Sequence, residues 1–82
     1  MNKITVMFHQ FILKQDIILY NGDKIINKFA VDLDKVVETI IILQKQYNLS
    51  EINLCGNSAF ISKFKNKLIN KFSNTNVQIN EI

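Results

Sequence analysis

The stretch "INLCGNSAFISKFKNKLINKF", residues 52–72, holds the pattern that decides the fold. An apolar run preceded by Glu51 predicts a short buried strand over 51–55, and Gly56 follows it as a turn residue. Asn57 or Ser58 then supplies an N-cap for a helix over 59–72. The apolar face of that helix consists of Phe60, Ile61, Phe64, Leu68 and Phe72. The stretch therefore predicts the strand–turn–helix crossover unit of an α/β domain.

Upstream, two apolar runs flank the sequence "YNGD", residues 20–23. Asn-Gly between apolar runs is a strong hairpin signal, because a type I′ turn requires positive φ at both central residues. A two-residue loop at Asn21-Gly22 predicts a register with Tyr20 opposite Asp23, Ile18 opposite Ile25 and Ile17 opposite Ile26. Both faces of this hairpin are apolar, so we expect the sheet to be covered on one side and partly on the other.

The first strand is predicted over "KITVMF", residues 3–8, which is rich in β-branched and aromatic residues. The pattern leaves open whether this strand ends near His9 or continues through Leu13. At the other end of the chain, the alternating segment "NVQINEI", residues 76–82, predicts the last strand.

From Asp32 the apolar period becomes helical, with Asp32 or Asp34 as the expected N-cap. Asn48, followed by an apolar residue, suits a left-handed C-terminal end. The apolar stripe of this first helix consists of Leu33, Val36, Val37, Ile40, Ile41, Leu43 and Tyr47.

The predicted order of elements is β-β-β-α-β-α-β in one domain, residues 1–82. Hairpins join antiparallel strands, and right-handed crossovers join parallel ones. The sequence therefore predicts an α/β fold with a five-stranded mixed sheet, antiparallel over the first three strands and then parallel, with two helices packed on it.

This order resembles that of ribonuclease H-like domains and of the half-domains of actin-like ATPases. The stretch "ILKQDIILYNGDKII" is similar to the second and third strands of such a domain. The stretch "INLCGNSAFISKFKNKL", with "VQI" further on, is similar to the strand–glycine–helix–strand close of an actin-like half. The resemblance implies a ribonuclease H-like topology over most of the chain.

The motifs that carry activity in these families are missing from this sequence. Where actin-like ATPases have an acidic residue and glycines, residues 8–11 read "FHQF", and the adenine-side double glycine reduces to Gly56-Asn57. Ribonuclease H-like nucleases need convergent carboxylates, yet residues 3–8 contain none, and Glu38 should face solvent. We therefore expect no enzymatic activity, no metal and no cofactor.

Composition restricts the environment and the partners. Cys55 is the only cysteine, which excludes an internal disulfide and fits a reducing compartment. No stretch approaches the roughly 20 apolar residues that cross a bilayer, so we expect a cytoplasmic protein without membrane contact. The net charge of +3 is made by lysine, since arginine is absent, and lysine with isoleucine and asparagine suggests an AT-rich gene such as those of phages or mobile elements.

Three local features are candidates for a binding or catalytic site. The predicted helix N-terminus at Gly56, Asn57 and Ser58 could bind an anion, although a tight turn and a cap explain the same residues. His9 has no nucleophile or carboxylate at a known motif spacing, so we expect a structural or exposed residue. Cys55 is interpreted as a small buried side chain.

Lys63, Lys67 and Lys71 recur every four residues and form a lysine ridge on the second helix, with Lys65 on the far side of the apolar stripe. Such a ridge is either a solvated helix face or a contact for nucleic-acid phosphates.

Two apolar side chains, Ile42 and Ile69, lie off the apolar stripes and are predicted to be exposed, as possible interface residues. Together with the apolar hairpin, they favour a non-enzymatic interaction domain that binds an unidentified protein or a second copy of itself, as a homodimer. The alternative is nucleic-acid binding through the lysine ridge.

Overall fold

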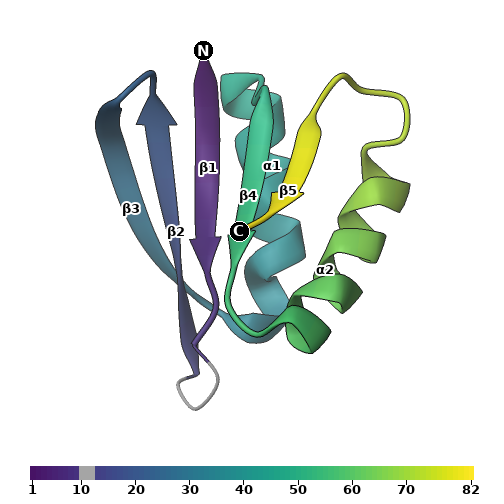
Figure 1. The fold of residues 1–82 in the computed structure, drawn as a ribbon. Helices are drawn as coiled ribbons and strands as arrows, with labels where there is room; N and C mark the ends of the chain where they lie inside the picture. The colour runs from purple at the N-terminus through teal and green to yellow at the C-terminus, as the bar shows by residue number, and fades with distance from the viewer. Residues whose placement is uncertain (10–12) are drawn as a thin grey trace.

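The computed structural model describes residues 1–9 and 13–82, and the side chain of Phe60 also lies outside its description. It consists of one five-stranded sheet and two α-helices (Figure 1). The elements are β1 (Asn2–Met7), β2 (Lys14–Asn21), β3 (Lys24–Asp32), the 3₁₀ turn η1 (Leu33–Lys35), α1 (Val36–Tyr47), β4 (Glu51–Cys55), α2 (Ser58–Lys71) and β5 (Gln78–Glu81).

The strand order across the sheet is β3-β2-β1-β4-β5. β1 pairs antiparallel with β2 and parallel with β4, so Ile4 lies between Leu19 and Ile52. β2 pairs antiparallel with β3, and β4 pairs parallel with β5. This arrangement confirms the predicted five-stranded mixed sheet with two helices.

The end of β1 was left open by the sequence pattern. The strand ends at Met7, and the Phe8 amide continues the ladder by donating to the Cys55 carbonyl at 2.9 Å. A strand running through Leu13 would involve residues 10–12, which lie outside the described residues.

The hairpin exists, but its predicted register is wrong. The two central turn residues are Gly22 and Asp23, not Asn21 and Gly22, because Asn21 pairs with Lys24. Only Gly22 has positive φ, at 62°, which is the pattern of a type II′ turn with glycine first. A register shift at Leu19/Tyr20 moves the pairs further, so Tyr20 lies opposite Ile25, Ile18 opposite Lys28 and Ile17 opposite Phe29.

The first helix begins later than its apolar pattern suggests. Asp32 precedes the 3₁₀ turn, and α1 itself has Lys35 at its N-cap position, with no side-chain capping bond at either place. Asp32, one of the two predicted caps, thus occupies the N-cap position of the 3₁₀ turn that runs directly into α1, but its side chain makes no capping hydrogen bond. Asp34, the other, lies inside the turn. At the other end Asn48 is left-handed, with φ 51°, and its amide bonds to the Gln44 carbonyl, as predicted.

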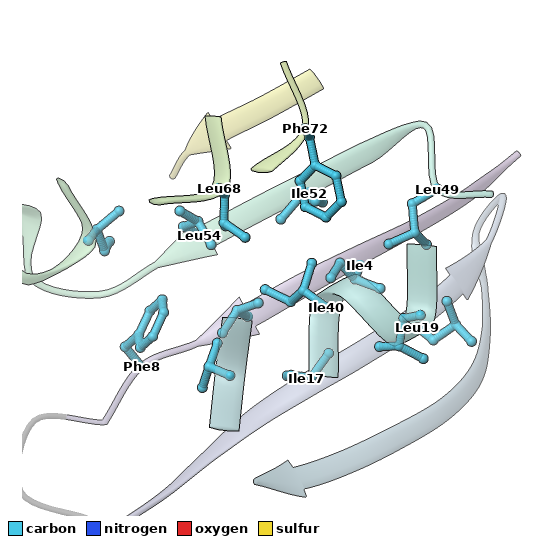
Figure 2. Packing of buried hydrophobic residues seen from close by; sticks show 14 residues of the cluster. Ile4, Phe8, Ile17, Leu19, Ile40, Leu49, Ile52, Leu54, Leu68 and Phe72 are labelled. Carbon is cyan, nitrogen blue, oxygen red and sulfur yellow. The ribbon is translucent and has the colours of Figure 1, made fainter. Parts of the chain in front are cut away.

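One face of the sheet packs against both helices. Every second residue of the central strands points toward α1 and α2, and among these Ile4, Ile17 and Ile52 are fully buried (Figure 2). The core consists of Ile4, Val6, Phe8, Ile17, Leu19, Val36, Ile40, Leu43, Leu49, Ile52, Leu54, Ile61, Leu68 and Phe72. The fold is thus a two-layer α/β sandwich.

Candidate interaction surfaces

The opposite face of the sheet has no helix in front of it among the described residues (Figure 1). Its side chains belong to strand positions that alternate with the core residues, and we call it the open face. From β3 to β5 the open face comprises Ile25, Lys28, Ala30, Tyr20, Ile18, Asp16, Lys3, Thr5, Met7, Glu51, Asn53, Cys55, Gln78 and Asn80. The partial cover expected on this side is not found within the described part of the chain.

The half of the open face on β3, β2 and β1 is mainly apolar. Ile18 lies at its centre, opposite Thr5 on one side and Lys28 on the other. Tyr20 lies beside Ile25, whose side chain is 59% exposed, and Met7 is 37% exposed. Apolar side chains on an uncovered sheet surface are a hallmark of a contact surface.

A cation–π contact orders one corner of this apolar half. The Lys3 ammonium lies 5.8 Å from the centroid of the Tyr20 ring, and both side chains are half-buried. Together with Thr5 and the hairpin turn, they line a shallow hollow of about 270 Å³. The hollow is open and small, so it suits a protruding side chain better than a bound metabolite.

The half on β4 and β5 is polar and internally bonded. The Asn53 amide donates to Glu51 at 3.0 Å and accepts from the Asn80 amide at 3.0 Å, and Gln78 donates to Asn80 at 3.2 Å. Asn53 is only 9% exposed, so this amide ladder satisfies a buried polar group on an uncovered surface. Sequence reasoning missed the ladder, although Gln78 and Asn80 alternate along one strand.

The helix N-terminus at Gly56, Asn57 and Ser58 has the geometry of a turn and a cap. Gly56 has φ 151°, and a Cβ there would lie 3.1 Å from the Phe8 Cβ. The Asn57 side chain accepts from the Ala59 amide at 3.1 Å and so caps α2. These contacts explain Gly56 and Asn57 without an anion, and Ser58 is the first residue of α2.

The lysine ridge is exposed, as predicted, since Lys63, Lys67 and Lys71 all face solvent. The Lys67 ammonium lies 5.6 Å from the centroid of the Phe64 ring. Lys65, on the far side of the apolar stripe, instead pairs with Glu81 of β5 at 3.4 Å. The structure therefore separates the three ridge lysines from the fourth one.

Ile42 and Ile69 are 51% and 45% exposed, which confirms their predicted exposure. Ile42 lies among polar residues on the outer side of α1. Ile69 lies one turn beyond Lys65, on the side of α2 that faces β5. Their proposed role as interface residues stays a prediction.

His9 has a partner that the sequence did not indicate. Its Nε2 lies 2.9 Å from a carboxylate oxygen of Asp16, and its backbone amide donates to the side chain of Gln15. Cys55 is half-buried on the open face, in register with Met7. Since Asp16 is also in register with Met7, one whole strand separates the carboxylate from the thiol.

An apolar groove of about 800 Å³ lies between the start of α1 and α2. Val37 and Phe64 form its apolar walls, and Asp34 and Lys67 stand at its rim with opposite charges. Leu13, 85% exposed, also borders it.

The described carboxylates do not converge. Glu38 faces solvent, as predicted, and lies 3.5 Å from Lys35. Within residues 1–9 and 13–82 no three His, Cys, Asp or Glu side chains gather as a metal site. No helix in the described part of the chain has the length and apolar character needed to span a membrane.

Comparisons with known proteins identify the fold. No protein-family model matches the chain, and no curated protein matches it. Among solved structures it is similar to a Bacteroides thetaiotaomicron protein with an actin-like ATPase fold and unknown function. The two are 12% identical with a TM-score of 0.75, over 99% of this chain and 32% of that one. The chain thus spans about a third of that protein and has the α/β topology of actin-like and ribonuclease H-like domains.

Proposed function

We propose that the chain is a non-enzymatic interaction domain, a degenerate copy of the actin-like or ribonuclease H-like fold, that forms a homodimer through its open face. The observation that carries the proposal is the uncovered sheet surface around Ile18, which holds Tyr20, Ile25 and Met7. Parallel strands are almost always covered on both faces, and β1, β4 and β5 are parallel. The unpaired Cys55 fits a reducing compartment, so the proposal places the dimer in the cytoplasm.

A second copy suits this surface because the surface is self-complementary. A two-fold axis that lies in the interface, runs perpendicular to the strands and passes over Ile18 stacks the two open faces on each other. It places β2 of one copy over β2 of the other, with the two strands antiparallel. Ile18 then meets Ile18, and Tyr20 of each copy lies over Asp16 of the other. The phenol can donate to that carboxylate, and Lys3 adds the complementary charge.

The same axis keeps the two halves of the face in matching surroundings. The apolar half packs on the apolar half, and the amide ladders of Asn53 and Asn80 meet each other. The axis also places Lys28 of each copy opposite Lys28 of the other, on the edge strand β3, where the flexible side chains can extend into water. The one like-charged pair of this stacking, Lys28 with Lys28, thus lies on the edge strand β3, while Asp16 lies next to Tyr20 of the other copy.

Sedimentation equilibrium tests the proposal with the variant Ile18→Asp. The wild-type chain should sediment with twice the 9.5 kDa mass of one chain, and Ile18→Asp should sediment as a single chain. Met7→Asp is the second variant and should also weaken the dimer. Circular dichroism checks that each variant is folded.

The matched control is Ile42→Asp combined with Ile69→Asp, which adds the same charge to exposed isoleucines of the helices. This double variant should remain dimeric. Dissociation of the double variant would move the interface to the helices, and a monomeric wild type at the highest soluble concentration would refute the dimer.

A further inference from the structure

Charge is distributed very unevenly over the molecule. α2 contains four lysines and no carboxylate. The other six lysines share the rest of the chain with all seven carboxylates. The whole positive excess of the protein therefore lies on one helix, on the side of the sheet away from the open face.

The exposed side of α2 combines these cations with neutral hydrogen-bonding groups. One residue before each ridge lysine stands an exposed Ser or Asn side chain. At 100° per residue, the six side chains span about half of the helix circumference. We call this surface the lysine–amide face, made of Ser62, Lys63, Asn66, Lys67, Asn70 and Lys71.

We propose that the lysine–amide face binds the phosphate backbone of nucleic acid. The ridge lysines follow one another at about 6 Å along the helix axis, so their ammonium groups can each meet a phosphate of one strand. Asn66 and Asn70 add uncharged donors, which are common phosphate contacts, whereas the Ser62 hydroxyl already donates to the Ser58 carbonyl at 2.9 Å. Lys63 and Lys71 have no ion pair among the described residues, so both charges are available.

Two other anionic partners fit this face less well. A helix that lies on a lipid surface inserts its apolar side, but in α2 that side is used in the core, with Leu68 fully buried and Ile61 1% exposed. An acidic protein offers carboxylates at irregular spacing, whereas the phosphates of a nucleic-acid strand repeat regularly and can follow lysines spaced at about 6 Å. Lysine acts as a point charge, which suits phosphate.

The absence of arginine also defines the mode of binding. Arginine makes the commonest base-specific contact, to guanine, so a surface of lysine and amides around a backbone should bind with little sequence preference. Binding should be strongly dependent on salt, because each neutralised phosphate releases condensed counterions.

Fluorescence anisotropy with a labelled DNA duplex, the same sequence as RNA duplex and a scrambled duplex tests the proposal. If three phosphates are neutralised, the Kd should rise about 40-fold between 50 and 200 mM salt. The scrambled duplex should bind equally well. The triple variant Lys63→Gln, Lys67→Gln, Lys71→Gln should lose this binding, and the corresponding triple change to arginine should retain it.

The matched control removes the same charge elsewhere, as Lys14→Gln, Lys24→Gln and Lys45→Gln, all exposed in the native chain. This control should bind as the wild type does, and so should Ile18→Asp, because the open face lies on the other side of the sheet. The proposal is overturned if no nucleic acid binds at low salt, or if the control loses binding as fully as the ridge variant. Equal binding to polyglutamate or to anionic phospholipid vesicles would also overturn it.

Discussion

The two faces of this sheet are built from the same strands and differ completely in chemistry. Along β1, Ile4 and Val6 are fully buried against the helices, whereas Lys3 and Thr5, which alternate with them, are half-buried on the open face. The covered face is almost entirely apolar, with the buried Gln15 as a polar exception, so burial of apolar surface is its main stabilising contribution. The open face joins an apolar half to a bonded amide ladder, a combination suited to a wet contact between folded surfaces.

In this small domain, the covered face determines the stability of the fold and the open face is the surface available for association. Removing a methyl group from the covered face should reduce the free energy of unfolding. Removing one from the open face should change association instead. The free energy of unfolding should therefore fall most for a substitution in the core and least for one at an exposed position of a helix.

Ile52→Ala should have the largest effect, lowering the free energy of unfolding by about 4 kcal/mol. Ile52 is fully buried on β4 within the core cluster, and truncation leaves a cavity there. Urea unfolding at a fixed protein concentration measures the loss. A loss below about 1 kcal/mol would show that the covered face is loosely packed.

Gly56→Ala should cost about 3 kcal/mol, because the backbone stands at φ 151° and the new Cβ would contact the Phe8 backbone oxygen at 3.3 Å. Gly22→Ala is the control. Gly22 has φ 62° and open space around it, so the change should cost only about 1 kcal/mol of backbone strain. Equal losses at the two glycines in thermal unfolding would refute close contact at Gly56.

Asn53→Ala should cost about 1 kcal/mol, since it removes the central member of the amide ladder and leaves Asn80 without its acceptor. The comparison variant is Asn66→Ala on the exposed face of α2, which should not destabilise the fold because alanine favours helix. If Asn53→Ala leaves the free energy of unfolding in urea unchanged, the amide ladder does not contribute to stability.

Ile42→Gln should have the smallest effect, within about 0.5 kcal/mol, because the side chain is already half in solvent on α1. The same measurement detects it. A loss of more than about 1 kcal/mol would mean that Ile42 is covered in solution, and that the helices contribute to an interface.

Much of this fold could be predicted from the sequence because the apolar periods are strong. Residues 51–55 form the predicted strand, and the Gly56–Asn57 turn starts the helix as expected. The hairpin register could not be predicted, because Asn21-Gly22 fits a type I′ turn and Gly22-Asp23 fits a type II′ turn. The irregularity at Leu19/Tyr20 also lies in an apolar run, where the sequence pattern does not mark it. The sequence marked Asp32 as the start of the helical segment but not the 3₁₀ turn there, which shifts the N-cap position of α1 itself to Lys35.

The candidate surfaces were less predictable than the fold. The lysine ridge follows from helical spacing alone, so its exposure was correctly predicted. The open face depends on both helices packing on the same side of the sheet, which two right-handed crossovers in one direction produce. The His9–Asp16 contact links residues on either side of a connection, where no periodicity applies.

An isotope-filtered NOE experiment on a sample mixed from labelled and unlabelled chains tests the central claim most directly. The open-face dimer predicts intermolecular NOEs from the Ile18 methyl groups and from the Tyr20 ring of one copy to the other. Intermolecular NOEs arising from Ile42 or Ile69 instead, with none from Ile18, would contradict the account.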